Sequence, residues 1–228
     1  MISVCVPVHE LRGAERLVRL QDALSAGLAG TDGELVVALN GVPESVAPQG
    51  VRAVRLPENL GVGPGWNAAA DVARGEILVF GNDDVIPGPR SLALLAGVLE
   101  SVEQAGIVGV DSWDAKQDAP RADSSETPRE CRAVRGPLLA VRKDTFEGVG
   151  GFDEDYAPCC WEEVDLSLAI RKKLGLRSYV LHVDFHHQPR ISARRALPWV
   201  RVAYAGRSES LRSIRRRNRQ RLAEKWGV

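Results

Sequence analysis

The sequence predicts an α/β protein with a mostly parallel, Rossmann-like sheet that carries helices on both faces. Three observations predict this fold class. Short apolar runs recur along the chain, segments with helical spacing separate them, and several runs end in polar clusters. A length of 228 residues, with 44% hydrophobic and 26% charged residues, is ordinary for one such domain. We therefore expect a single domain whose ligands bind where the strands end.

The first half of the chain alternates between expected strands and helices. Residues 2–8 form a β-branched apolar run that stops at polar His9 and Glu10, and leucines at helical spacing follow it. Later runs end at Asn40-Gly41 and at Asn82-Asp83-Asp84, and an Ala-rich helix lies between them. The strands expected in this half are residues 2–8, 34–39, 51–56 and 76–80, and the helices are residues 11–24, 65–73 and 92–102.

The second half contains a long polar segment. Residues 111–129 are rich in Asp, Ser, Pro and Ala and lack apolar periodicity, which predicts a mobile loop. A lid, an acceptor-binding segment and a plain excursion all fit this composition. A helix at 163–174 closes at Gly175, and from Gly206 onward a run of arginines predicts a basic helix. The strands expected here are residues 107–110, 134–141 and 178–185.

Charge and cysteine content narrow the classes of partner. Lys+Arg and Asp+Glu are both 30, so no overall field directs the chain to nucleic acid, and no nucleic acid partner is expected. No apolar run reaches the ~18 residues of a membrane-spanning helix, and the start of the chain does not resemble a signal peptide, so we expect a cytoplasmic protein. Four cysteines lack the paired spacing of a zinc site, which predicts reduced thiols: Cys5, Cys131, Cys159 and Cys160.

A cluster of acidic residues follows the apolar run 76–80. Asn82-Asp83-Asp84 offers carboxylate and amide oxygens, which are the ligands that a hard divalent cation prefers. By itself, the same cluster is equally typical of a turn or of a helix cap. Two interpretations therefore stay open from this motif alone, a cation site and a structural turn.

A glycine-rich segment, residues 59–67, precedes this strand and enters the Ala-rich helix. Glycines let the backbone approach a ligand closely, and the start of a helix favours anionic groups. A flexible connection has the same composition. The segment is therefore a candidate phosphate contact that needs support from other motifs.

Two further motifs lie in the second half. Gly150-Gly151-Phe152-Asp153-Glu154 precedes Trp161-Glu162-Glu163-Val164-Asp165-Leu166, which opens the last expected helix before the tail. Acidic residues in a first helical turn commonly interact only with the helix dipole. His186-His187 follows the last expected strand, and a pair of histidines in a terminal turn is a better ligand candidate than a lone one.

The order of these motifs resembles glycosyltransferase family 2, whose members have the nucleotide-diphospho-sugar transferase (GT-A) fold. The resemblance covers residues 3–187 and runs through the glycine-rich segment, N-D-D, G-G-F-D-E, E-E-x-D-L and the late H-H. It implies that Asp84 and His186 hold Mn²⁺ or Mg²⁺, with His187 as an alternative ligand. It also implies that Glu163 is the catalytic base, at a position where the family usually has Asp.

The resemblance further implies a division of the chain. Residues 1–187 form the GT-A domain, with a nucleotide-sugar-binding half at 1–110 and an acceptor-binding, catalytic half at 130–187, and residues 188–228 form a basic helical extension. Asn40 stands where the family usually has an Asp that contacts the base or ribose, so it offers an amide instead of a carboxylate. The implied donor contacts are Pro7, His9, Glu10, Asn40, Asn59, Gly61, Asn67, Asn82 and Asp83, and the implied acceptor contacts are Gly136, Trp161 and Glu162.

These observations predict an inverting, metal-dependent glycosyltransferase that moves a sugar from a nucleotide diphosphate sugar to an acceptor hydroxyl, in polysaccharide or glycoconjugate synthesis. The acceptor is expected to be a saccharide or a lipid-linked molecule, and the basic tail is a candidate for contact with the inner face of an acidic membrane. A non-catalytic protein that binds nucleotide sugars or nucleic acid is one alternative, but it leaves the acidic motifs unexplained. A sugar nucleotidyltransferase is another, but residues 8–13 contain only a faint version of its phosphate-binding loop.

Overall fold

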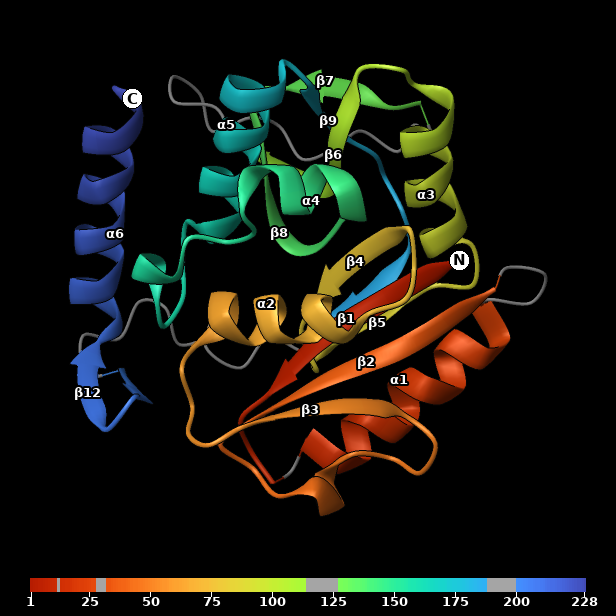
Figure 1. Cartoon of the computed structure of the whole chain (residues 1–228), viewed down its shortest axis with the longest axis vertical. Helices are drawn as coiled ribbons and strands as arrows, with labels where there is room; N and C mark the ends of the chain where they lie inside the picture. Colours follow the sequence, from red (N-terminus) through yellow and green to blue (C-terminus); the bar gives the residue numbers. More distant parts are fainter. Residues whose placement is uncertain (12, 28–31, 114–126, 188–199) are drawn as a thin grey trace.

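An eight-stranded sheet forms the centre of the computed structural model, which describes residues 1–11, 13–27, 32–113, 127–187 and 200–228 (Figure 1). Its strand order is β3-β2-β1-β4-β8-β6-β9-β7. The strands are β1 (Ile2–Val8), β2 (Gly33–Asn40), β3 (Arg52–Leu56), β4 (Ile77–Gly81), β6 (Ala105–Trp113), β7 (Arg129–Cys131), β8 (Ala133–Arg142) and β9 (Arg177–Val180). The helices are α1 (Gly13–Gly27), α2 (Val62–Val72), α3 (Ser91–Ser101), α4 (Lys143–Val149), α5 (Glu162–Leu174) and α6 (Leu211–Trp226), with single 3-10 turns at η1 (Glu44–Val46) and η2 (Glu154–Tyr156).

The direction of the strands is mixed. β1 pairs in parallel with β2 and β4, β2 with β3, and β6 with β9. β8 runs antiparallel to both β4 and β6 and thereby joins the two halves of the sheet, and β7 runs antiparallel to β9. The predicted fold class, a largely parallel sheet with helices on both faces, is confirmed, whereas the reversed strand between β4 and β6 was not foreseen because periodicity carries no information on direction.

Two apolar cores lie on opposite faces of this sheet. Alternate residues of β1 show the division, because Val4 and Val6 belong to one core and Cys5 to the other. The first core packs under α1 and α3 and the second under α2, α4 and α5. In the second core, Trp66, Phe80, Phe146 and Phe152 make ring contacts with one another, and these contacts tie α2 and β4 to the second half of the chain: Trp66–Phe80, Trp66–Phe152, Phe80–Phe146, Phe80–Phe152 and Phe146–Phe152.

Two short strand pairs correct the sequence-based boundaries. The expected strand 178–185 ends at Val180, and a separate strand β10 (Phe185–His187) pairs with β5 (Val85–Pro87). The basic helix expected from residue 206 is preceded by the hairpin of β11 (Arg201–Tyr204) and β12 (Arg207–Ser210). Helix α6 begins after Ser210, whose hydroxyl oxygen accepts from the amide of Ser213 and caps the first turn.

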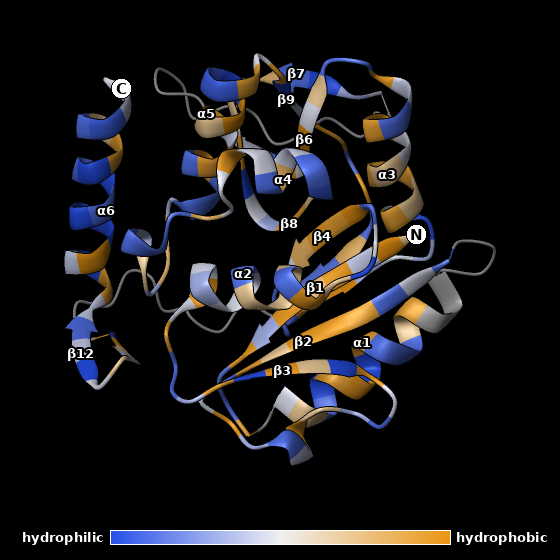
Figure 2. Ribbon diagram, in the orientation of Figure 1, coloured by the Kyte–Doolittle hydropathy of each residue, from blue (hydrophilic) through white to orange (hydrophobic). Residues whose placement is uncertain are grey.

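The C-terminal helix packs on the second half of the chain. Leu222 and Trp226 join a third, smaller apolar cluster with Tyr156, Val164 and Leu168. Leu211 and Ile214 of α6 are also buried, whereas most of the other side chains of the helix are polar, and Figure 2 shows much of α6 in the hydrophilic colour. No helix among the described residues is long and apolar enough to span a bilayer.

Both ends of the predicted loop at residues 111–129 belong to strands. Residues 111–113 complete β6, and residue 129 begins β7. The remainder of the predicted loop, residues 114–126, lies outside the described residues. The four cysteines are free thiols, as the sequence predicted.

Candidate active site

The turn that follows β4 carries the acidic cluster and leads directly into β5. The main-chain amide of Val85 donates to the carbonyl oxygen of Asn82 at 3.1 Å and closes the turn. Asp83 faces α1, where the Nε of Arg16 donates to its Oδ2 at 2.8 Å. Burial raises the pKa of the Asp83 carboxyl, and the charge of Arg16 opposes that rise. Asp83 therefore anchors the turn to α1, a role different from the donor contact that the motif implied.

Asp84 has a different environment from its neighbour. Its Oδ1 is buried and has no hydrogen-bond partner among the described residues. The Nε2 of His187 lies 3.7 Å from this oxygen. Burial raises the pKa of the Asp84 carboxyl, and the charge of His187 opposes that rise. A buried carboxylate oxygen without a hydrogen bond is costly, and it is the environment expected of a cation ligand.

The histidine beside Asp84 is His187, whereas the sequence analysis placed His186 first. β10 pairs with β5 so that His187 lies opposite Val85, the residue after Asp84. Side chains alternate along a strand, so His186 points to the other face of this strand pair. The structure therefore places His187, the alternative ligand of the sequence analysis, beside Asp84.

Asp84 and His187 fit a divalent cation as a partial set of ligands. A carboxylate oxygen and an imidazole nitrogen both suit Mn²⁺, and Mg²⁺ is commonly bound by one or two carboxylates together with substrate phosphates. Within the described ranges, no group of three or more His, Cys, Asp or Glu side chains gathers as a metal cluster. The pair therefore fits a cation that binds together with a diphosphate better than a closed structural metal site.

The end of β1 lies beside the acidic turn, because β1 and β4 pair in parallel. Pro7 is buried beneath α2, and a Cβ at Gly65 would come within 2.6 Å of the Pro7 Cβ. His9 and Glu10 are about half exposed, and 3.7 Å separates the Nε2 of His9 from the Oε1 of Glu10. Of the three donor contacts predicted here, His9 and Glu10 are the ones that a ligand can reach.

The glycine-rich turn before α2 is fixed by two of the predicted donor residues. Asn40 is buried, its Nδ2 donates to the carbonyl of Gly61 at 2.8 Å, and its Oδ1 accepts from the amide of Leu60 at 2.8 Å. The Oδ1 of Asn59 accepts from the amide of Gly61 at 3.0 Å. These amide groups are already used by main-chain bonds, so the structure assigns Asn40 and Asn59 to support of the turn.

Asn67, one turn into α2, supports the second half in the same way. Its Nδ2 donates to the carbonyl of Phe152 at 2.9 Å, and its Oδ1 accepts from the amide of Phe152 at 2.9 Å. Gly151 has a φ of +75°, and a Cβ there would lie 2.9 Å from the Asn67 Oδ1. The G-G-F-D-E motif is thus explained as a turn that closes against α2.

Glu163 lies in the first turn of α5, at the expected acceptor side. It is partly exposed, and the main-chain amide of Gly136 in β8 lies 3.4 Å from its Oε1, a long contact. Gly136 has a φ of +111°, next to the point where the register between β6 and β8 shifts, so glycine is required there. The structure thus brings together two of the residues predicted to act on the acceptor, Glu163 and Gly136.

Glu162 and Trp161 differ from Glu163 in their surroundings. Glu162 is 4% exposed, and its Oε2 has no hydrogen-bond partner in the described part of the chain. Burial raises the pKa of this carboxyl well above its ordinary value, and the neighbouring charge of Glu163 raises it further. Trp161 stands edge to face against Trp113, with 6.1 Å between the ring centroids. Burial thus disfavours the charged form of Glu162, and Glu163 is the more accessible carboxylate of the pair.

The sequence of residues 31–123 matches the family model described as glycosyl transferase family 2. This segment of the chain is thus similar in sequence to family 2 glycosyltransferases. It contains the glycine-rich turn and the acidic cluster, and the resemblance predicted from the motifs is confirmed over these residues. No curated protein sequence matches the chain.

Solved structures confirm the GT-A fold around this family 2 segment. TarS residues 1–349 from S. aureus superposes with a TM-score of 0.59 at 18% identity and covers 79% of this chain and 57% of its own. GalNAc-T7 with UDP, GalNAc and Mn²⁺ gives 0.65 at 16% identity, over 83% of this chain and 44% of its own. Mannosyltransferase PcManGT from Pyrobaculum calidifontis, with GDP-Man and Mn²⁺, gives 0.58 at 19% identity, over 80% and 55%. The chain thus spans about half the length of these proteins.

Sequence reasoning missed two contacts in the family 2 site. Arg16 is one of several arginines on the first expected helix, and no pattern distinguishes it from the others. Arg135 donates from Nε to the Oδ2 of Asp111 at 2.9 Å, immediately before Gly136. Both contacts join residues far apart in the sequence, so only the fold reveals them.

Proposed function

We propose that this protein is a glycosyltransferase that uses a divalent cation to transfer a sugar from a nucleotide diphosphate sugar to an acceptor hydroxyl, with inversion at the anomeric carbon. The observation that carries the proposal is the buried Oδ1 of Asp84, which has no hydrogen-bond partner among the described residues and lies 3.7 Å from the Nε2 of His187. The match to family 2 and the GT-A fold support it. A sugar nucleotidyltransferase finds no such support.

The donor diphosphate is expected at the sheet edge formed by the ends of β1 and β4. Asp84 and His187 would hold Mn²⁺ or Mg²⁺ there, and the ion supplies charge neutralisation for a diphosphate leaving group. Arg16 keeps Asp83 out of the cation shell by pairing with it. His9 and Glu10 line the open side of the same edge.

The acceptor hydroxyl is expected beside Glu163. The hydroxyl oxygen attacks the anomeric carbon as the bond from that carbon to the phosphate oxygen breaks, and the hydroxyl proton passes to a carboxylate oxygen of Glu163. The nucleoside diphosphate leaves on the opposite face, so the configuration inverts. Glu163 is the more accessible member of its pair, whereas burial disfavours the charged form of Glu162.

The solved structures with a similar fold and the exposed side chains of α6 support a choice of substrate classes to test. TarS binds UDP and UDP-GlcNAc, and PcManGT binds GDP-Man, so uridine and guanosine diphosphate sugars are the first donors to test. The acceptor is a saccharide or a lipid-linked saccharide in this proposal. Exposed arginines at i, i+4 and i+7 on α6 suit the phosphate of such an acceptor or an acidic membrane surface: Arg212, Arg216 and Arg219.

Calorimetry of nucleoside diphosphates tests the cation site. We expect UDP or GDP to bind more tightly with Mn²⁺ than with EDTA, and Asp84→Asn to remove this gain while leaving the fold intact. His187→Ala should weaken the gain, whereas His186→Ala is the matched control and should retain it. Release of nucleoside diphosphate from a panel of UDP- and GDP-sugars then tests transfer. A wild-type protein that binds neither nucleotide, with or without metal, would contradict the proposal.

A further inference from the structure

The loop at residues 156–161 immediately precedes the pair Glu162-Glu163. It has no regular secondary structure after η2. Two successive residues have positive φ, Cys160 at 80° and Trp161 at 81°. Non-glycine residues rarely adopt this conformation, so contacts from outside the loop must hold it.

Helix α6 supplies these contacts through one fully buried side chain. The Nδ2 of Asn218 donates to the carbonyl oxygens of Tyr156 at 2.6 Å, Cys159 at 2.9 Å and Cys160 at 3.1 Å. The neighbouring Arg217 donates from Nη2 to the carbonyl of Ala157 at 2.6 Å. Four carbonyl groups of the loop are therefore bonded to two adjacent residues of α6.

A second set of contacts holds the start of α5. Asp165 has a side chain only 3% exposed, and its Oδ1 accepts from the hydroxyl of Tyr156 at 3.0 Å and from Nε1 of Trp226 at 2.7 Å. Its Oδ2 accepts from Nζ of Lys225 at 2.9 Å. The helical turn that carries Glu163 is thus bonded to the last turn of α6.

The same loop rests against the glycine-rich turn of the donor side. The amide of Val62 donates to the carbonyl of Pro158 at 2.8 Å, and a Cβ at Gly61 would lie 2.7 Å from the Pro158 Cα. The hairpin that leads into α6 holds this turn as well, because Nδ2 of Asn59 donates to the carbonyl of Ala203 at 2.9 Å. The C-terminal segment therefore contacts both sides of the candidate active site.

We propose that α6 is a clamp that sets the position of the acceptor-side loop, and that Asn218 is its principal positioning residue. This inference rests on the proposed function, because the loop matters through Glu163 and Trp161. Without the Asn218 bonds, residues 156–161 relax toward more favourable backbone conformations, and Glu163 moves relative to the acceptor hydroxyl. The donor side keeps its own ligands, Asp84 and His187.

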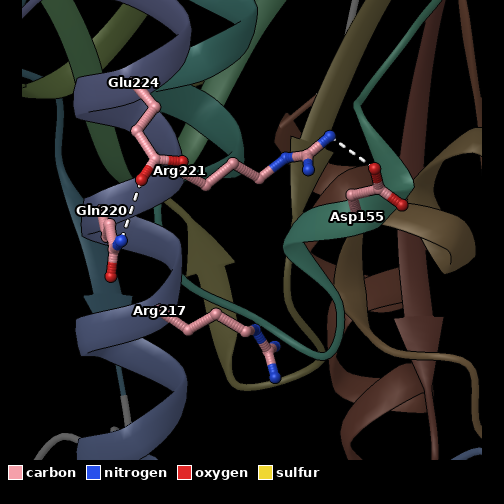
Figure 3. Close-up of a pocket in the computed structure, with 5 residues that line it drawn as sticks. All are labelled: Asp155, Arg217, Gln220, Arg221 and Glu224. Carbon is pink, nitrogen blue, oxygen red and sulfur yellow. Dashed lines mark hydrogen bonds and ion pairs between the residues drawn. The ribbon is translucent and has the colours of Figure 1, made fainter.

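The surface of α6 around the clamp supplies matched controls. A cavity of about 310 Å³ lies between α6 and the segment that contains η2. Figure 3 shows the residues that line it: Asp155, Arg217, Gln220, Arg221 and Glu224. Arg221 reaches across it to Asp155, whereas Gln220 donates to Glu224 on the same helix at 2.8 Å. Gln220→Ala therefore alters α6 next to the clamp without touching the loop.

The first experiment measures the loop directly, and it needs no substrate. Asn218→Ala and Arg217→Ala are each compared with Gln220→Ala. Arg217 provides a second clamp variant because its side chain is 41% exposed, so its replacement should disturb the folded core less than replacement of the buried Asn218. We expect both clamp variants to speed hydrogen exchange in residues 156–161. We also expect the labelling of Cys159 and Cys160 by a disulfide reagent to rise roughly tenfold with loss of the bonds. Rates equal to those of the controls would overturn the proposal.

The second experiment separates positioning from general stability. With a donor and acceptor that the wild type uses, Asn218→Ala or Arg217→Ala should lower kcat by about 10²-fold, the effect of a catalytic group misplaced by about 1 Å. The KM for the donor and the affinity for UDP or GDP with Mn²⁺ should stay close to those of Gln220→Ala. An unchanged kcat in both clamp variants would refute the clamp with the proposed function intact. Failure of the wild type to bind either nucleotide would refute the function, while the exchange and labelling data would still report on the clamp.

Discussion

Adjacent acidic residues have unequal environments at both ends of the candidate site. Asp83 is paired with Arg16, whereas Asp84 has a buried oxygen without a hydrogen-bond partner among the described residues. Glu162 is buried and its pKa is raised, whereas Glu163 is partly exposed. Two like groups held in different environments can take different roles, one structural and one chemical. The E-E and D-D pairs therefore each contribute one reactive carboxylate to the proposed mechanism.

The proposed base is tested by two substitutions of one residue. Glu163→Gln keeps the shape of the side chain and removes its basicity, so turnover should fall roughly 10²–10⁴-fold while donor affinity stays nearly unchanged. Glu163→Asp restores the residue usual in the family, and it should be tolerated if the pocket suits the shorter side chain. Steady-state kinetics and nucleotide titration measure both effects. Full transfer by Glu163→Gln would move the base assignment to another carboxylate.

Glu162 makes the stability of the protein depend on pH. Its folded-state pKa is raised above the ordinary value of 4.5, so its carboxyl stays protonated in the folded chain while it ionises in the unfolded chain. Its contribution to stability is fully present below the unfolded pKa and is lost as pH rises toward the folded pKa. The side chain at position 162 cannot ionise in Glu162→Gln. The free energy of unfolding of this variant should therefore increase relative to that of the wild type as pH rises above about 4.5. Urea unfolding of both proteins across this range measures the difference, and parallel pH profiles would contradict it.

At the scale of elements, the sequence predicted most strands and helices, because buried strands and amphipathic helices leave strong periodic signals. It did not predict that β8 reverses between β4 and β6, since the direction of a strand depends on its connections. It missed the β5–β10 pair, whose strands of three residues are too short for a pattern. The choice of His187 over His186 depends on the register of that pair, so it could not be made from the order of residues alone.

The predicted asparagines show a second limit of sequence reasoning. An amide side chain can bond a ligand or a backbone with the same groups. Asn40 and Asn67 bond the backbone of the glycine-rich turn and of the G-G-F-D-E turn, and those partners lie 20 or more residues away. The motifs correctly identified the segments that matter. They did not show whether each polar residue faces the ligand or supports the loop beneath it.

The glycine-rich turn and the acceptor-side loop meet at a contact that excludes a side chain. Gly61 has φ +107° and ψ −178°, a conformation essentially restricted to glycine, and a Cβ there would meet the Pro158 backbone. Gly50 also has positive φ, at 79°, but has no atom within 4 Å of its added Cβ. Gly50→Ala should therefore lower the free energy of unfolding by about 1–2 kcal/mol. Gly61→Ala should lower it by about 1–3 kcal/mol more than Gly50→Ala does. Thermal or urea unfolding measures both, and equal losses would mean that the contact with Pro158 is unimportant.

At the scale of the whole molecule, the C-terminal helix packs against the domain that contains the sheet. The sequence predicts residues 188–228 as a basic helical extension. In the structure, Leu222 and Trp226 of α6 lie in an apolar cluster with Tyr156, Val164 and Leu168. Lys225 and Arg221 also pair with acidic groups of the G-G-F-D-E and E-E-x-D-L segments. We therefore expect α6 to unfold cooperatively with the rest of the domain.

Leu222→Ala tests this consequence, because Leu222 is only 1% exposed and packs with Tyr156, Val164 and Leu168, which are far from it in the sequence. Removal of a buried leucine side chain costs about 2–5 kcal/mol, and in a chain of this size each kcal/mol lowers Tm by roughly 2–4 °C. Leu174→Ala, at a leucine that is 41% exposed on α5, is the control and should lower Tm much less. If α6 folds with the sheet, calorimetry should show one transition in Leu222→Ala, shifted as a whole. A main transition that stays at the wild-type temperature, with a small separate one below it, would mean that α6 is an independent extension, and the clamp on the acceptor-side loop would then lack its mechanical basis.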